Sequence, residues 1–383
     1  MIEMRRVDVF RAGPGFARPK ALPSIGLLLW MGMLGWSCLG HRSNPSPEMR
    51  TPTVLPTPSR TAQPTAPPIA SPTPAPRLWR LTHPACCTSP FWSPDGREVW
   101  VIDRPDPEAP AGIWGIPLSG GAPRPVMTRL GVFSPDFRRV AYPEAGQTVI
   151  EDLQTGERWI APTGGRAVVF SPDGEWIAWE VSAGNAPSLE RRVPTLWIAR
   201  ANGEEARPLI RLIGGGFAGW FPDGEDVLVI QREAPGADPF LAVVHRPDGS
   251  LRRIAQGERL RGAQISPEGG WIAYQNLFAA DPGQSGLWVV RKDGSGARRL
   301  LVFGAYRWRR EGALLVIPLE PGAPSHRAVE IDAASGAIRP LTDPAALPFR
   351  IAGGDWALSP DGQRIVFVSA EDRHLWILEL PSP

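Results

Sequence analysis

The hydrophobic and polar positions of the chain form short blocks, each a turn-forming group followed by an apolar run. In "FWSPDGREVWVI" (residues 91–102), Ser-Pro-Asp-Gly favours a reverse turn, and the β-branched and aromatic residues after it favour a strand. "FSPDGEWIAWEV", which begins at Phe170, has the same form. Because a turn and one strand cannot bury their own apolar faces, we expect such blocks to stack against copies of themselves.

The block recurs along most of the chain. With Ser93 as the marker position, further copies have their markers at Ser134, Ser171, Phe221, Ser266 and Ser359, and a degenerate copy has Arg309 at the marker and Gly312 at the glycine. Successive markers are 37 to 50 residues apart. Helical repeats of this length need apolar residues spaced three and four apart, which these segments lack. The spacing suits four short strands per unit and predicts an all-β fold, a seven-bladed β-propeller.

Each copy continues with a second apolar run and then a strand that carries basic residues, as in "TLWIAR" (195–200) and "EARPLIR" (205–211). The last copy stops after "HLWILELPSP", one strand short, whereas "RLWRLTHP" at 77–84 matches a fourth strand but precedes the first marker. We therefore expect the N-terminal strand to complete the last blade. Such closure of the ring removes the exposed strand edges that favour aggregation.

The "SPDG…IA(F/W/Y)" blocks resemble the TolB-type, WD-like propeller repeat, which also builds the propeller half of prolyl oligopeptidase and dipeptidyl peptidase enzymes. The resemblance covers residues 77 to 380. It implies a fold and not a function, because the matching residues form turns and core strands. The turn aspartates are interpreted as hydrogen-bond acceptors that cap the turns, not as acids or ligands: Asp95, Asp136, Asp173, Asp223 and Asp361.

The composition agrees with a folded core that carries an appended tail. The chain is 43% hydrophobic and 21% charged with a net charge of +2, which does not indicate a nucleic-acid-binding protein. Seven blades account for residues 77–383, so no second catalytic domain is expected. We expect this propeller to be a monomer.

The first 38 residues have the pattern of an export signal. Arginines such as Arg5 and Arg11 precede an apolar run at 21–36, which is shorter than the about 20 residues that a membrane-spanning helix usually needs. "GWSC" at 35–38 resembles the lipobox of bacterial lipoproteins, although Trp36 departs from the usual small residue. The resemblance implies that Cys38 carries a lipid anchor. The alternatives are an ordinary cleaved signal and an uncleaved anchor with a free Cys38.

Residues 39–76 are rich in proline and threonine and almost lack aromatic and large apolar residues. This composition predicts a disordered, extended and semi-rigid linker that cannot form a core. The order of lipid anchor, linker and propeller predicts an extracytoplasmic protein, at the cell surface or in the periplasm, whose head is held away from the membrane.

Two adjacent cysteines, Cys86 and Cys87, lie in "THPACCTSP" between the closing strand and the first blade. A vicinal disulfide is one prediction for an oxidising compartment. Two free thiols are the alternative, and His83 adds the hypothesis of a metal site. Neighbouring side chains on an extended segment point to opposite faces, which works against chelation by both sulfurs.

No catalytic residue is predicted. A prolyl oligopeptidase-type hydrolase needs a G-x-S-x-G elbow on an α/β domain, and neither is found in the sequence. Some propellers that resemble this one are pectin-fragment lyases with histidine-held metal ions. A metal-dependent polysaccharide (uronate) lyase is therefore the alternative function, with four candidate histidines: His83, His245, His326 and His374. TolB has an α/β domain where this chain has its linker, so a role in the TolB envelope complex is not expected.

The favoured function is non-catalytic binding of a protein or a glycan, without a cofactor or metal. Arg129, Arg166 and Arg261 stand five residues before the markers of blades 2, 3 and 5, where the chain enters the innermost strand. Arginines at other offsets occupy the corresponding junctions of blades 4, 6 and 7: Arg211, Arg307 and Arg350. A mouth lined by one sign of charge attracts anions, and the guanidinium fork suits carboxylates and phosphates. The sequence predicts that this mouth binds an acidic ligand, either an anionic glycan or an acidic protein segment.

Overall fold

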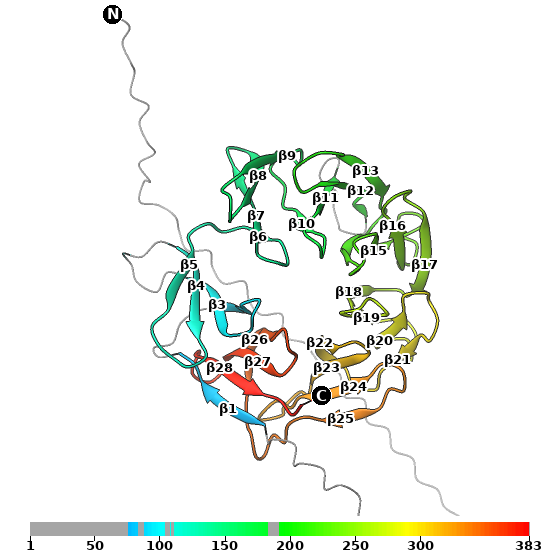
Figure 1. Cartoon of the computed structure of the whole chain (residues 1–383). Coiled ribbons are helices and arrows are strands. Elements are labelled where there is room, and N and C mark those ends of the chain that lie inside the picture. Colours follow the sequence, from blue (N-terminus) through cyan, green and yellow to red (C-terminus); the bar gives the residue numbers. More distant parts are fainter. Residues whose placement is uncertain (1–75, 83–87, 104–107, 109–110, 183–190, 383) are drawn as a thin grey trace, which may run out of the picture. The chain divides into compact units, whose positions relative to one another are not determined.

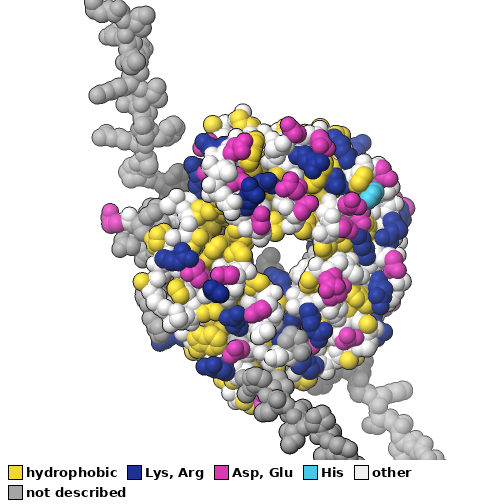
Figure 2. All heavy atoms as spheres, in the orientation of Figure 1, with side chains coloured by type: hydrophobic (Ala, Val, Ile, Leu, Met, Phe, Trp, Pro, Cys, Tyr) yellow, Lys and Arg dark blue, Asp and Glu magenta, His cyan; other side chains and the backbone are white. Residues whose placement is uncertain are grey.

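Seven four-stranded antiparallel sheets are arranged as blades around a central channel (Figure 1). The computed structural model describes residues 76–82, 88–103, 108, 111–182 and 191–382. The space-filling view shows that side chains leave the channel open at its centre (Figure 2). The predicted all-β, seven-bladed propeller is therefore confirmed.

Several predictions from the sequence lie outside the described residues. These are the export signal with Cys38, the linker at 39–75, and the segment with His83, Cys86 and Cys87. They stay predictions.

The blades follow one another in chain order, and within each blade the innermost strand comes first. Blade 1 contains β2 (Thr88–Trp92), β3 (Glu98–Asp103), β4 (Gly112–Pro117) and β5 (Arg124–Met127). Blade 2 contains β6 (Val132–Phe133), β7 (Arg139–Glu144), β8 (Gln147–Asp152) and β9 (Arg158–Ala161). Blade 3 contains β10 (Val169–Phe170), β11 (Trp176–Ser182), β12 (Pro194–Arg200) and β13 (Arg207–Arg211). Blade 4 contains β14 (Gly216–Trp220), β15 (Asp226–Gln231), β16 (Phe240–His245) and β17 (Leu251–Gln256). Blade 5 contains β18 (Leu260–Ile265), β19 (Trp271–Asn276), β20 (Gly286–Arg291) and β21 (Arg298–Arg299). Blade 6 contains β22 (Gly304–Arg310), β23 (Ala313–Pro318), β24 (Val329–Asp332) and β25 (Ile338–Pro340). Blade 7 contains β26 (Ile351–Leu358), β27 (Arg364–Ser369), β28 (Leu375–Glu379) and β1 (Arg77–Arg80).

The second strand of a blade contains a continuous apolar run because neighbouring blades cover both of its faces. All six residues of β23 are buried, and β27 is buried from Ile365 to Ser369. A strand that faced water on one side would alternate apolar and polar residues. The continuous apolar runs in the sequence therefore reflect the packing of blade on blade.

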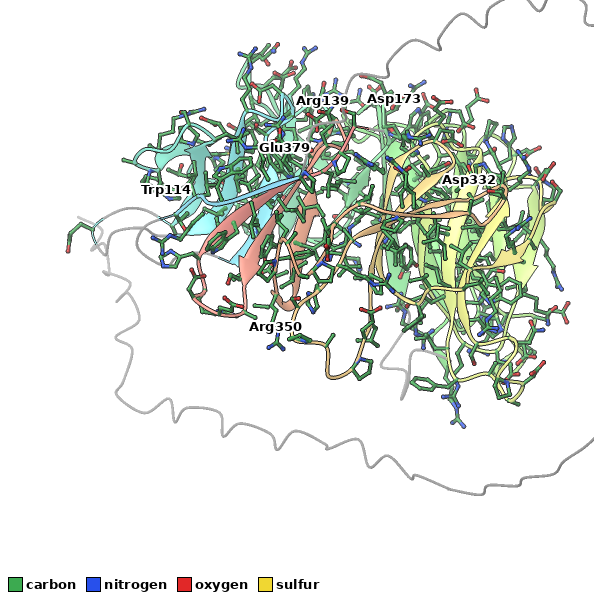
Figure 3. The ribbon with its side chains drawn as sticks, turned by 90° about the horizontal axis from the view of Figure 1, so that it is seen from below. Trp114, Arg139, Asp173, Asp332, Arg350 and Glu379 are labelled. Atoms are coloured by element: carbon green, nitrogen blue, oxygen red, sulfur yellow. The ribbon has the colours of Figure 1, made fainter. Side chains whose placement is uncertain are left out.

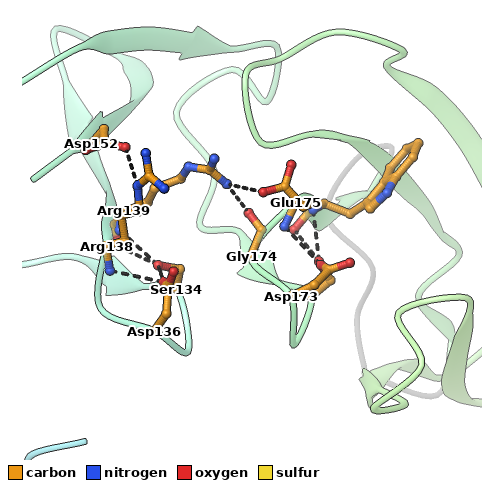
Figure 4. A network of polar contacts seen from close by, with 10 residues as sticks. Ser134, Asp136, Arg138, Arg139, Asp152, Asp173, Gly174 and Glu175 are labelled. Carbon is orange, nitrogen blue, oxygen red and sulfur yellow. Dashed lines mark hydrogen bonds and ion pairs between the residues drawn. The ribbon is translucent and has the colours of Figure 1, made fainter. Parts of the chain in front are cut away.

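The repeated turn joins the first strand of each blade to the second, and its serine and aspartate fix its shape. In blade 2, Ser134 Oγ donates to Asp136 Oδ1 (2.5 Å) and accepts from the backbone N–H of Arg139 (2.9 Å). Figure 4 shows this turn beside that of blade 3, where Arg139 donates to Gly174 O (2.6 Å). In blade 1, the hydrogen bond from Ser93 lowers the pKa of Asp95. The interpretation of the turn aspartates as caps agrees with these contacts.

The two ends of the channel carry different parts of the repeat. Each repeated turn joins the end of an innermost strand to the second strand, so all the repeated turns lie at one end, here called the turn end, and the innermost strands begin at the other, here called the leading end. Figure 3 shows this arrangement: Arg139 and Asp173 lie near one end of the ring, and Arg350, which precedes β26, lies at the opposite end.

The N-terminal strand closes the ring as predicted. β1 pairs with β28 from Arg77 opposite Glu379 to Arg80 opposite Trp376. Beyond β1, Leu81 N donates to Leu375 O (2.8 Å), and Leu375 N donates to the buried hydroxyl of Thr82 (3.0 Å). The last blade thus holds both ends of the propeller together.

Six of the seven blade interfaces contain a hydrophobic cluster with buried residues from both blades. Between blades 3 and 4, Ile198 belongs to one cluster with Val229 and Ala242. Burial of a whole aliphatic side chain contributes about 1.5–3 kcal/mol. At the interface of blades 1 and 2, the described residues form only one small cluster, Val140, Tyr142 and Val149, all from blade 2.

An aromatic contact occupies this unusual interface. Phe137 stands where the other six blades have the turn glycine, and its φ of 55° lies in the left-handed region. That conformation costs a residue with a Cβ about 1–2 kcal/mol. The Phe137 ring meets Trp100 of blade 1 edge-on, with centroids 5.0 Å apart, and stacks on Phe133 at 5.3 Å. The phenylalanine bridges two blades that share no buried cluster among the described residues.

Removal of residues 77–84 should lower the melting temperature by 10 °C or more, on the order expected for the loss of several kcal/mol from a domain of this size. Blade 7 would keep only three strands, and the edge of β28 would be exposed. Thermal unfolding should be compared with that of a chain that starts at Pro76 and keeps β1. Equal melting of the two proteins would contradict the closure of the ring by β1.

The contact between Trp100 and Phe137 should appear as a coupling energy in a double-mutant cycle. Substitution of each by leucine, alone and together, should give a coupling of about 0.5–1.5 kcal/mol in the free energy of unfolding. A cycle between Trp100→Leu and Phe278→Leu, in blades 1 and 5, serves as the control and should be additive within about 0.5 kcal/mol. No coupling between Trp100 and Phe137 would show that the rings do not hold blades 1 and 2 together.

Candidate functional site

A pocket of about 210 Å³ lies at the leading end, between blades 4 and 5. Its apolar walls include Phe217 and Ile230 of blade 4 and Leu260 of blade 5. Three arginines line it: Arg192, Arg232 and Arg261. Together with backbone from 214–216, these residues make a small cavity in which all the charged lining side chains are cations.

Three consecutive glycines shape one wall of the pocket. A Cβ on Gly215 would lie 1.7 Å from the carbonyl oxygen of Ile230, so only glycine allows this approach to β15. The same segment is tied to two of the arginines. Gly214 N donates to Arg192 O (2.8 Å), and Arg232 N donates to Ile213 O (2.8 Å). The glycine run thus brings both arginine backbones to the pocket wall.

Arg232 is the most buried of the three arginines, with 8% of its surface exposed. Its Nε donates to Gly214 O (3.3 Å), and its Nη1 donates to Ala237 O. Within the described ranges, its side-chain hydrogen bonds end on backbone carbonyls, and no ion pair with a carboxylate involves it. A buried cation without a counter-charge is costly, so an anion in the pocket would stabilise it.

Arg192 and Arg261 complete the charge of the pocket. Arg192 forms an ion pair with Glu180, whose carboxylate also accepts the backbone N–H of Phe217 (2.6 Å). The Nε of Arg192 is buried and has no hydrogen-bond partner in the described part of the protein. Arg261 is exposed, and its Nη1 donates to Leu260 O (2.9 Å). Glu180 is paired with Arg192, whereas the described residues form no ion pair with Arg232 or Arg261, so the lining of the pocket carries an excess of positive charge.

The three arginines predicted from the repeat have different surroundings. Only Arg261 lines the pocket. Arg129 lies in the junction before β6, where its Nε is 3.4 Å from Glu151 and its guanidinium stacks 4.7 Å from the Tyr142 ring centroid. Arg166 precedes β10, and its Nη1 donates to Thr163 O (2.8 Å). A site shared by all three arginines stays a prediction, whereas the pocket groups Arg261 with two arginines that the repeat did not indicate.

The other junction arginines also lie outside the pocket lining. Arg211 ends β13 opposite Thr195 in the sheet. Arg307 lies over the Trp356 ring, 5.1 Å from its centroid. Arg350 precedes β26 at the leading end (Figure 3). These three arginines add positive charge to blades 3, 6 and 7.

The described histidines lie at different ends of the propeller. His245 ends β16, toward the turn end, and its Nδ1 is 2.9 Å from Asp226, which raises its pKa. His326 precedes β24 and accepts the backbone N–H of Ile351 (3.2 Å), and burial lowers its pKa. His374 directly precedes β28. Among the residues that the structure describes, no group of three or more His, Cys, Asp or Glu is placed to hold a metal ion.

Several solved structures have a similar fold. An oligogalacturonate lyase in complex with manganese has a TM-score of 0.56 and 14% identity, covering 81% of this chain and 94% of its own. The propeller domain of the Trilobed protease from Pyrococcus furiosus, described as having an open velcro topology, has a TM-score of 0.51 and 14% identity, covering 77% and 97%. TolB from Acinetobacter baumannii has a TM-score of 0.40 and 13% identity, covering 76% and 79%. At these identities the likeness shows the fold alone.

No model of a known protein family matches the chain, and comparison with curated proteins gives no match. The described residues contain no helix with the length and hydropathy that crossing a membrane requires.

Proposed function

We propose that this propeller is a non-catalytic binding head that takes an acidic ligand in the pocket between blades 4 and 5. The observation that carries the proposal is the buried guanidinium of Arg232, which meets backbone carbonyls but no carboxylate among the described residues. A ligand carboxylate or phosphate would supply the missing counter-charge. Arg192 and Arg261 line the same cavity and add two further forks for such a group.

The size of the expected effect follows from the surroundings of the arginines. A hydrogen bond to a charged group contributes about 1.5–3 kcal/mol, and a wall of apolar side chains strengthens it by excluding water. Phe217, Ile230 and Leu260 provide such a wall. A single carboxylate held by two of the arginines would therefore bind with useful affinity, which would weaken as salt screens the charges.

The position of β1 shows at which end of the channel the chain enters the propeller. Arg77, the first residue of β1, pairs with Glu379, and the next residue, Leu380, donates its N–H to Gln363 O in the repeated turn of blade 7 (2.8 Å). The chain therefore enters the propeller near the turn end. In the extracytoplasmic, lipid-anchored arrangement that we propose, the linker would join the propeller at the turn end, whereas the pocket lies at the leading end.

A metal-dependent uronate lyase is the alternative function. The likeness to an oligogalacturonate lyase supports a shared fold at 14% identity, and it carries no residue of that enzyme to this chain. The described part of the chain offers no cluster of three metal-binding side chains. Binding is proposed first because the buried guanidinium of Arg232 favours an anion in the pocket.

Substitution of Arg192 or Arg261 by glutamine should weaken the binding of an acidic probe about 10-fold or more for each lost charge-assisted contact. The probe is fluorescently labelled hexaglutamate, and the measurement is fluorescence anisotropy at low and high salt. The substitutions should also flatten the salt dependence, because fewer charges take part. Arg232 is left unchanged in this test, because its burial makes a folding defect difficult to separate from lost binding.

Arg129→Gln is the matched control. It removes the same charge at the same end of the channel, but Arg129, which is paired with Glu144 and Glu151, does not line the pocket. Binding of hexaglutamate should not change in this variant. If Arg192→Gln and Arg261→Gln bind hexaglutamate at low salt with unchanged affinity, the proposal is wrong. Formation of an unsaturated product from oligogalacturonate in the presence of Mn²⁺ would favour the lyase instead.

The lipid anchor has its own test. Cys38→Ser should move the protein from the membrane fraction to the soluble fraction, because a serine cannot carry the lipid expected at the lipobox-like site. Fractionation of expressing cells followed by detection of the chain measures this. If the variant stays with the membrane, the apolar run at 21–36 is the anchor and the lipid is not required.

A further inference from the structure

Four large apolar side chains are exposed on the loops at the leading end of blades 5 and 6, the blades that follow blade 4 beside the arginine pocket. Leu301 is 88% exposed, Phe278 77%, Leu319 65% and Phe303 37%. We call these four residues the apolar rim. Single exposed apolar residues are common on protein surfaces, but several large ones on adjacent loops mark an interaction site.

Backbone and side-chain contacts hold the loops of the apolar rim together. Leu319 N donates to Phe303 O (2.9 Å), which places the end of β23 beside the start of β22. Gln275 Nε2 donates to Gly304 O (3.4 Å) and links the end of β19, near Phe278, to blade 6. The apolar rim is therefore one surface that crosses from blade 5 to blade 6.

The apolar rim is also continuous with the pocket. Leu277 N donates to Arg259 O (3.1 Å), and the two residues after Arg259 are Leu260 and Arg261 of the pocket lining. A ligand with an acidic group in the pocket can therefore extend onto the neighbouring loop that carries Phe278.

The loop that carries Phe278 is held in an unusual conformation. Phe278 has a φ of 51°, in the left-handed region that residues with a bulky side chain rarely adopt. The loop after it is fixed by Ala279 N, which donates to Ser285 Oγ (2.8 Å), and by Ala280 N, which donates to the carboxylate of Glu258 (2.9 Å). The loop thus keeps Phe278 in an unfavourable backbone conformation with its side chain exposed to water. Strain of this kind is typical of binding sites.

We infer that the acidic ligand is a segment of another protein, whose carboxylates enter the pocket and whose apolar side chains cover the apolar rim. This inference rests on the proposed function of the pocket. Sugar rings bring hydroxyl groups that need hydrogen-bond partners, whereas the leucine and phenylalanine side chains of the rim have no polar atom to offer. Apolar protein side chains bury the rim without leaving polar groups unpaired. The combination of a cationic pocket and an apolar rim without polar side chains therefore favours an acidic and apolar peptide over an anionic glycan.

The test compares two short peptides on the purified full chain in mild detergent. One peptide has two glutamates followed by a leucine and a phenylalanine, and the other has serines in place of those two apolar residues. The apolar peptide should bind more tightly, on the order of 10- to 100-fold. The double variant Phe278→Ser with Leu301→Ser should lose this difference and should bind hexaglutamate as the unaltered protein does.

Ile160→Ser is the matched control, because Ile160 is 59% exposed on β9 of blade 2, away from the rim. It should keep the full preference for the apolar peptide. Equal binding of the two peptides, or a preference that survives in the rim variant, would overturn the inference while the pocket remains a site for acids. A concentration-dependent dimer that the rim variant abolishes, without any peptide preference, would overturn it in favour of a second copy of this chain. Hexaglutamate binding that ignores the pocket arginines would remove the proposed function and this inference with it.

Discussion

A four-stranded blade has two apolar faces and can cover neither of them alone, and this constraint organises the whole propeller. Each sheet is stable only between two others, so the sheets must form a ring, and the ring must be closed at its last blade. The buried clusters shared by neighbouring blades meet the first requirement at six interfaces. The pairing of β1 with β28 meets the second, because it joins the first strand of the domain to its last blade.

The interface of blades 1 and 2 is the exception, and its side chains explain two departures from the repeat. Phe137 replaces a glycine at a left-handed position, and its ring contacts Trp100 in the neighbouring blade. Arg129, which stands at a repeated position before the innermost strand, is held on the blade 2 surface by Glu151 and Tyr142. Arg129 thus has carboxylate and aromatic neighbours, whereas Arg261, at the equivalent position of blade 5, lines the pocket. Equivalent positions in a repeat therefore need not have equivalent surroundings.

The proposed binding surface is built from the parts of the chain that do not repeat. The glycine run at 214–216, Arg192 and Arg232 lie in connections whose sequences occur once. The loop of Phe278 and the junction around Leu301 are likewise particular to their blades. The repeated turns and strands supply a rigid frame, while the connections at the leading end differ from blade to blade and carry the chemistry. This division explains why a likeness in fold extends to proteins with different activities.

The sequence by itself determined the fold, because turn chemistry and apolar runs are local signals that recur in every blade. It located all seven markers, including the degenerate one at Arg309, and it assigned residues 77–80 to the last blade from a missing strand. It indicated Arg261 from its position in the repeat, and this residue lines the pocket between blades 4 and 5. Only the tertiary structure showed that Arg192 and Arg232 join it, because these residues are distant in sequence and meet through the close approach of Gly215 to Ile230. Which charges form ion pairs depends on the folded arrangement and cannot be read from distances along the sequence. Only the structure therefore distinguished Arg129, which is paired with Glu151, from the buried Arg232, which meets no carboxylate among the described residues.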